Sequence, residues 1–222
     1  MIFYIFHLFK NKIYNIYKIR KSQIIKRYGE IKRMNYITDV SLYNKENDTV
    51  NAIIEICPGT RDKKELIEPY FNELITVRQV EGVYPFYYGS FPQTYAGDKD
   101  PLDLILFTDK EHSELDLVKV DVIGAIKTID AGEQDDKIIC IEHDSSILNA
   151  KKYLKKALKF LRQYKGKHAD MTISKSLASM SEADTLVKQA HEAWKEHTKP
   201  KKVAMNNSVS TGRNQKIRVI RR

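Results

Sequence analysis

The chain of 222 residues is long enough to enclose one well-packed core, and its 42% hydrophobic content excludes wholesale disorder. The longest apolar run, Met1 to Phe9, is much shorter than the roughly 20 residues that cross a bilayer, so we expect no membrane-spanning segment. The two cysteines, Cys57 and Cys140, form neither a zinc motif nor a disulfide framework. They are expected to be buried in strands, and they predict a reducing, cytoplasmic location.

The net charge of +9 is distributed unevenly along the chain. Residues 1–33 carry nine Lys/Arg and one acidic residue, and residues 199–222 carry eight Lys/Arg and no acid, so each end contributes +8. The segment 34–198 therefore has a net charge of −7. We predict a folded domain at 34–198 and a basic, disordered tail at 199–222. For the basic extension at 1–33, a non-native upstream addition and an organelle-targeting role both stay open.

Short hydrophobic runs typical of strands fill the first two thirds of the domain, and helical periodicity follows. We predict strands at Ala52–Ile56, Leu102–Phe107, Leu117–Ile129 and Lys137–Glu142. A helix is predicted from Ile147 to Tyr164, and a second helix over Glu182–His197 with Ser181 as its N-cap. Strands followed by helices predict an α+β, mainly β domain, in which a small barrel has two helices packed outside it.

Three carboxylates stand at fixed spacing where a turn enters a predicted strand. Asp98, Asp100 and Asp103 belong to the run DKDPLD at residues 98–103. Because side chains alternate between the two faces of a strand, Asp103 can point into a pocket while its neighbours face the core. Taken alone, this run is explained equally well by an acidic turn exposed to water.

A second acidic turn, DAGEQDDK at residues 130–137, also joins two predicted strands and contains Asp130 and Asp135. If the two turns meet, they supply five or more carboxylate oxygens, which are the ligands that Mg²⁺ prefers. Cations and phenols that suit a small polyphosphate lie beside predicted strand and helix ends: Lys63, Arg78, Lys137, Lys165, Tyr88 and Tyr164. Together these residues favour a metal-dependent site for a small phosphate anion.

With these motifs the chain resembles the family I soluble inorganic pyrophosphatases over residues of about 50 to 197. The run 98–104 resembles that family's signature, D-x-D-P-x-D-hydrophobic, and residues 84–94 resemble the segment that leads into it. Residues 130–137 are similar to the family's D-x-G-E-x-D-x-K turn, and Tyr164-Lys165 matches its late Tyr-Lys pair. Upstream, residues 54–65 are similar to its first metal-facing strand and substrate lysine.

The resemblance implies an OB-like closed β-barrel that hydrolyses inorganic pyrophosphate with a metal-activated water and Asp100 as the general base. It implies three to four Mg²⁺ ions per site, held by six carboxylates: Glu55, Glu65, Asp98, Asp103, Asp130 and Asp135. The two phosphoryl groups would be bound by Lys63, Arg78, Tyr88, Lys137, Tyr164 and Lys165. The resemblance also implies a homo-oligomer, for which a dimer and a hexamer both stay open.

Two alternative functions stay open at this point. A nucleic-acid-binding barrel with basic arms would explain the two basic ends, although an acidic body would repel phosphate backbones. A hydrolase of another phosphoanhydride, such as a nucleoside triphosphate, would use the same carboxylates, but no base-recognition motif supports it. Two departures from the family pattern, Cys57-Pro58 after the first strand and the short spacing from Arg78 to Tyr84, touch no expected metal ligand.

Overall fold

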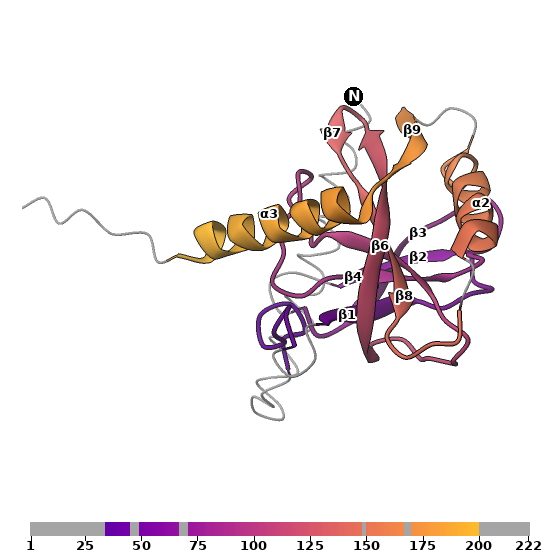
Figure 1. The fold of residues 1–222 in the computed structure, drawn as a ribbon. Helices are drawn as coiled ribbons and strands as arrows, with labels where there is room; N and C mark the ends of the chain where they lie inside the picture. Colours follow the sequence, from indigo (N-terminus) through magenta and orange to yellow (C-terminus); the bar gives the residue numbers. More distant parts are fainter. Residues whose placement is uncertain (1–33, 45–48, 67–70, 148–149, 167–169, 200–222) are drawn as a thin grey trace, which may run out of the picture.

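The computed structural model describes residues 34–44, 49–66, 71–147, 150–166 and 170–199 (Figure 1). The basic extension at 1–33 and the tail beyond residue 199 lie outside the described residues. The described part is mainly β-structure, with two helices that flank one large sheet.

Five strands of the large sheet form a closed ring, as predicted for an OB-like barrel. Their order is β1 (Val50–Ile56), β4 (Tyr87–Ser90), β5 (Asp103–Phe107), β8 (Lys137–Glu142) and β6 (Leu117–Asp130). A pairing between β1 and β6, from Val50 opposite Val120 to Ile53 opposite Leu117, closes the ring. The strands β5 and β8 run parallel, while the other four pairings of the ring are antiparallel.

Strand β6 is long enough to bend from the ring into a second arm of the sheet. Its first half pairs with β1 and β8, and its second half pairs with β7 (Glu133–Gln134) and β9 (Met171–Ala178). Register shifts between Val122 and Gly124 and between Ile126 and Thr128 mark the bend. At Gly124 a Cβ atom would lie 2.8 Å from the carbonyl oxygen of Ala178, so only glycine fits there.

A separate hairpin stands beside the barrel. It consists of β2 (Asp62–Leu66) and β3 (Leu74–Gln79), which form a two-stranded antiparallel sheet. In their register Lys63 lies opposite Arg78. The hairpin therefore presents two cations as a cross-strand pair, although they stand 15 positions apart in the sequence.

The two helices cover different parts of the barrel. Helix α3 (Met180–Thr198) crosses the barrel in Figure 1 and buries Ala183, Val187 and Ala190 in a core cluster shared with the ring strands. Helix α2 (Ala150–Leu161) lies to one side and buries Ala157, Phe160 and Leu161 in a second, aromatic-rich cluster. Each apolar helix face thus packs on the sheet, as the α+β prediction requires.

The structure confirms the predicted strands to within two residues at each end. It corrects the N-cap of α3, because Ser179 rather than Ser181 accepts the backbone N–H of Glu182 and completes a capping box. It also adds strands that were not predicted, namely β2, β3, β4 and β7 before the helices and β9 between them. Both cysteines are free: Cys140 is buried in β8 as expected, but Cys57 is half-buried just after β1. Within the described residues, neither helix is long and apolar enough to span a membrane.

Candidate active site

A buried ammonium group joins the two acidic turns at one edge of the barrel. Asp103 begins β5 and Lys137 begins β8, and because these strands are parallel neighbours their first residues lie side by side. The Lys137 Nζ lies 2.6 Å from Oδ2 of Asp103 and also forms an ion pair with Asp135. The hydroxyl of Tyr88 donates to the same oxygen of Asp103. The structure thus brings together four of the predicted site residues.

Charge neutralisation holds this group together, because the Lys137 side chain is only 1% exposed. Burial favours the neutral acid at Asp103, but Lys137 and Lys63 lower the pKa of that carboxyl to about 2. Burial also opposes charge on Lys137, yet Asp103 and Asp135 raise the pKa of its ammonium group. At Asp135 the effect of burial outweighs the opposing charge of Lys137, and the pKa of this second carboxyl lies above its usual value. One lysine therefore compensates Asp103 well and Asp135 poorly.

The turn with Asp98 and Asp100 adds more negative charge to the same place. Both side chains are half-buried, and Oδ1 of Asp98 accepts the backbone N–H of Asp100 at 3.2 Å. Burial, followed by the charges of Asp103, Asp135 and Asp100, raises the pKa of Asp98 to about 7. Asp98 is thus a carboxylate whose negative charge the surrounding protein does not balance.

Glu55 on β1 lies beside this centre. It is 4% exposed, and its Oε1 accepts a hydrogen bond of 2.7 Å from the Ser90 hydroxyl on the neighbouring strand β4. Burial raises the pKa of Glu55 to about 8, against the opposing charge of Lys63. Although burial opposes the charge of Lys63, Asp103 and Glu65 raise the pKa of its ammonium group well above the usual value. The Lys63 Nζ lies 3.9 Å from Glu65 and 4.5 Å from the ring centre of Tyr88.

A third group of predicted residues gathers around the turn that follows α2. Lys165 forms an ion pair with Asp130 at the end of β6. The guanidinium carbon of Arg78 and the Nζ of Lys165 lie 5.2 Å and 5.6 Å from the ring centre of Tyr164. Burial, with the charges of Arg78 and Lys63, lowers the pKa of Lys165 to about 8. Lys63, Arg78 and Lys165 are thus close enough to repel one another. An anion bound among them would be stabilised by their positive charge.

Oxygen ligands are abundant here, but they do not form a ready metal cage. Among the described residues, no three His, Cys, Asp or Glu side chains are grouped closely enough to hold a metal ion. Lys137 and Lys165 instead lie against the carboxylates that the sequence assigns to metal binding. The donor set nevertheless fits Mg²⁺, because it consists of carboxylates and because the uncompensated charge at Asp98 favours a nearby cation.

Two further polar residues belong to this place but were not assigned from the sequence. Ser90 is 2% exposed and holds Glu55, and Tyr84 is 1% exposed. The Tyr84 hydroxyl has no hydrogen-bond partner within the described residues, and Lys63 and Arg78 act on it electrostatically. The alternation of Tyr84, Phe86 and Tyr88 is the signal that could have revealed it, since residues two apart share one face of an extended chain.

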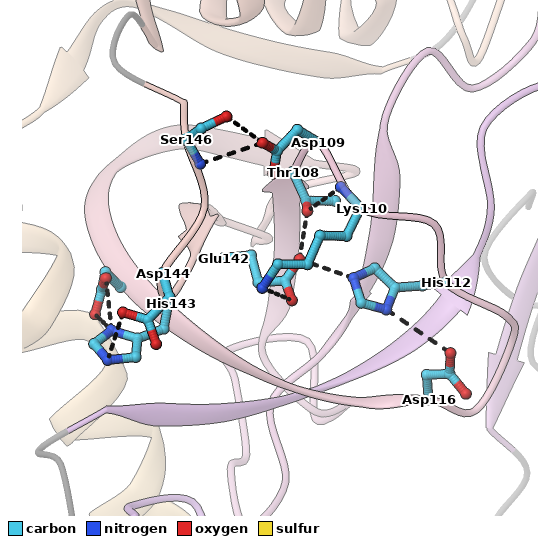
Figure 2. Close-up of polar contacts among 10 residues, drawn as sticks. Thr108, Asp109, Lys110, His112, Asp116, Glu142, His143, Asp144 and Ser146 are labelled. Carbon is cyan, nitrogen blue, oxygen red and sulfur yellow. Dashed lines mark hydrogen bonds and ion pairs between the residues drawn. The ribbon is translucent and has the colours of Figure 1, made fainter.

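A separate polar cluster lies at the opposite end of β8 (Figure 2). Glu142 pairs with Lys110 at 3.1 Å and His112 at 2.9 Å, and it accepts a hydrogen bond from Thr108. Because Glu142 comes five positions after Lys137 along the strand, the two centres lie about 17 Å apart. The cluster fastens the loop between β5 and β6 and belongs to the framework rather than to the candidate site.

An OB-like barrel with clustered carboxylates, lysines and buried tyrosines at one edge defines a hydrolase of small phosphate anions. Residues 52–195 match the family model of inorganic pyrophosphatase, which covers well over half of the chain. The chain therefore belongs to the inorganic pyrophosphatase family, and the resemblance noted in its sequence is confirmed. The nucleic-acid-binding barrel is not retained as its principal function.

Relatives and solved structures agree with this assignment. An inorganic pyrophosphatase of Dictyostelium discoideum is 29% identical over 230 aligned positions, covering 82% of each chain. One from Neisseria meningitidis serogroup A is 30% identical, covering 65% of this chain and 88% of the relative. The type I inorganic pyrophosphatase of P. falciparum superimposes with a TM-score of 0.65 at 26% identity, covering 73% of this chain and 64% of that one. A similar structure from Toxoplasma gondii, with a TM-score of 0.67 at 22% identity, supports the fold alone; it covers 75% of this chain and 89% of that one.

Proposed function

We propose that this protein hydrolyses inorganic pyrophosphate to two phosphate ions. The observation that carries the proposal is the meeting of the two acidic turns at Lys137. Asp103 and Asp135 share its ammonium group, while Asp98 beside them has its pKa raised to about 7. Such a place attracts cations, and the neighbouring Lys63, Arg78 and Lys165 attract an anion. The family membership of the chain supports the same activity.

The proposed cofactor is Mg²⁺, with three to four ions per site. The residues that would hold them are Glu55, Glu65, Asp98, Asp103, Asp130 and Asp135. When bound, these ions lower the pKa of a water molecule, neutralise the substrate and stabilise the leaving phosphate. Burial, followed by the charges of neighbouring carboxylates, raises the pKa of Asp98. This supports the assignment, because a divalent cation stabilises the ionised carboxylate.

Pyrophosphate would be bound by Lys63, Arg78, Tyr88, Lys137, Tyr164 and Lys165. Lys137 and Lys165 already pair with carboxylates, which fixes the position of their ammonium groups in the site. Phosphoryl oxygens can take over these charge-assisted hydrogen bonds. Burial raises the pKa values of Tyr88 and Tyr164, so both phenols stay protonated at neutral pH and act as donors.

Asp100 is the proposed general base. It is half-buried in the same turn as Asp98, and its backbone carbonyl accepts the N–H of Ala96 at 2.8 Å, which holds the turn in place. Its carboxylate would accept the proton of the attacking water while the bond between the attacked phosphorus and the bridging oxygen breaks. The negative charge that develops on the leaving phosphate would be stabilised by Lys63, Arg78 and Lys165.

All residues with a proposed role lie between Glu55 and Lys165, so the proposed catalytic domain is residues 34–198. Assembly as a homo-oligomer, either a dimer or a hexamer, and a cytoplasmic location are part of the proposal. The proposed reaction requires neither a bound nucleic acid nor attachment to a membrane.

Phosphate release from pyrophosphate by the purified full chain tests the proposal. With several millimolar Mg²⁺, phosphate should appear steadily, and a metal chelator should stop its release. The absence of release above a boiled control between pH 6 and 9 would reject the assignment.

A further inference from the structure

The outer face of α2 is densely and exclusively basic. On this face, and in the turn that follows it, the exposed charged side chains are Lys152, Lys155, Lys156, Lys159 and Arg162. Their spacing of three and four residues puts them on one side of a helix with 3.6 residues per turn. The buried residues Ala157, Phe160 and Leu161 lie on the other side, against the barrel. We call these five cations the α2 row.

The α2 row has no compensating charge in the described part of the chain. None of its five members has an ion-pair partner there. By contrast, Lys195 on α3 pairs with Glu192 at 2.8 Å. Like charges three and four residues apart destabilise a helix. The first turn of α2 contains no acid that could interact favourably with the helix dipole. A bound anionic partner would reduce the repulsion among these like charges and so stabilise the helix.

The α2 row also leads toward the candidate active site. The turn that follows α2 carries Arg162 and then, three residues later, Lys165. Lys165 lies in the site, beside Tyr164 and paired with Asp130. An open hollow of about 310 Å³ lies along the row, lined by Lys155, Leu158, Lys159, Arg162 and Gln163. A flexible chain of negative charges bound at Lys165 can therefore continue along the helix.

We propose that the α2 row binds linear inorganic polyphosphate, the longer homologues of pyrophosphate. The proposal rests on the proposed function, because it extends a site for two linked phosphates to a chain of them. A polyphosphate carries charge on every unit and has no bases or apolar groups, and the row correspondingly offers cations without an aromatic platform. The exposed aromatic ring of α2, Tyr153, packs 5.3 Å from the ring of Phe107 on the barrel.

Other polyanions fit this surface less well. Single-stranded nucleic acids gain affinity by stacking bases on aromatic side chains, which the row does not present. A membrane-bound helix inserts its apolar face, but that face of α2 is buried on the barrel. The observations therefore favour a partner that is recognised by phosphate charge alone.

Binding of a fluorescent polyphosphate to the full-length protein at several salt concentrations tests the proposal. Three double variants are compared with the parent: Lys155→Glu/Lys159→Glu, the milder Lys155→Gln/Lys159→Gln, and the control Lys119→Glu/Lys188→Glu. The control makes the same charge change at exposed lysines of β6 and α3. Because the basic ends are identical in all four proteins, any difference arises from the substituted positions. Glutamine keeps a high helix propensity, so its variant separates charge loss from misfolding.

The parent should bind polyphosphate, and the α2 reversal should weaken binding on the order of tenfold while the control stays close to the parent. For single-stranded nucleic acids, each contact between a cation and a phosphate contributes about 0.7 to the slope of log K against log salt concentration. If the same value holds for polyphosphate, loss of two contacts should make this slope shallower by about 1.4. Pyrophosphate hydrolysis should be unchanged in all variants, so a failure of the proposed function is recognised separately. Equal weakening in the control, no polyphosphate binding, or preferred binding of RNA or phosphatidylserine vesicles would overturn the proposal.

Discussion

The ammonium group of Lys137 lies 2.6 Å from a carboxylate oxygen of Asp103, and both residues begin parallel, neighbouring strands. This pair fixes the geometry of the site before any ligand arrives, because the lysine is almost completely buried. It also connects stability with function, since the same two side chains are expected to contact metal and substrate.

Replacement of Lys137 by glutamine should therefore destabilise the metal-free protein. It leaves Asp103 and Asp135 without their cation, and loss of one partner of a buried pair costs about 3–5 kcal/mol. Denaturant unfolding in the presence of a chelator measures the change. If the pair is the cause, Lys137→Gln and Asp103→Asn should be non-additive by about 0.5–3 kcal/mol, and strict additivity would contradict it.

The same pair predicts part of the acid denaturation. The pKa of Asp103 is lowered to about 2 in the folded protein, against about 3.9 for an unperturbed aspartate. Its stabilising contribution is therefore present above pH 4 and lost as the pH falls toward 2. In Lys137→Gln this component of the stability–pH curve should shrink, because only Lys63 then remains as a cation that lowers the pKa of Asp103. A curve identical in shape to that of the parent would show that the Lys137–Asp103 pair does not control it.

Asp98 should behave in the opposite way. Burial and neighbouring carboxylates raise its pKa to about 7, so its ionised form destabilises the folded chain at neutral pH. Asp98→Asn should raise the metal-free melting temperature and reduce the additional rise that Mg²⁺ produces. For the parent, one ion at 100 times its dissociation constant should add about 2.7 kcal/mol. The exposed Asp144→Asn is the matched control, and equal Mg²⁺ shifts in all three proteins would exclude Asp98 as a ligand.

The sequence predicted four strands of the ring and both helices because each carries a clear hydrophobic pattern, but it did not predict the short ring strand β4. The strand β9 escaped notice, since Met171–Ala178 is polar and exposed enough to resemble a loop, and only its pairing with β6 makes it a strand. The motifs predicted which residues would lie close together around Lys137 and Lys165. Their electrostatic roles were not predictable, because the contact of Lys137 with Asp103 depends on parallel pairing of strands 34 positions apart.

Lys165 should give the reaction an alkaline limit. Its pKa is lowered to about 8, so in the free protein it is charged below this pH and increasingly neutral above it. Because the charged form binds phosphate, KM for pyrophosphate should rise as the pH increases through about 8. Arginine stays charged throughout this range, so Lys165→Arg should lack that rise. Protonation of pyrophosphate itself affects the parent and Lys165→Arg equally. If KM rises with pH in the same way in both proteins, Lys165 is not the cause of the rise.

The basic ends should be dispensable for catalysis, because every assigned residue lies between Glu55 and Lys165. A chain of residues 34–200 should keep the turnover of the full-length protein. Circular dichroism would verify that it folds, and a folded but inactive chain would show that one of the ends contributes to the site.

The most direct test of the account is the turnover of Asp100→Asn with pyrophosphate and saturating Mg²⁺, measured beside Asp144→Asn. Asparagine keeps the size of the side chain but cannot accept the proton of the attacking water. The rate should fall by about 10²–10⁴, the usual contribution of a general base, with melting behaviour nearly unchanged. Asp144→Asn should retain parental turnover. An Asp100→Asn protein with more than about a third of the parental rate would contradict the assigned mechanism, because a general base contributes far more than that.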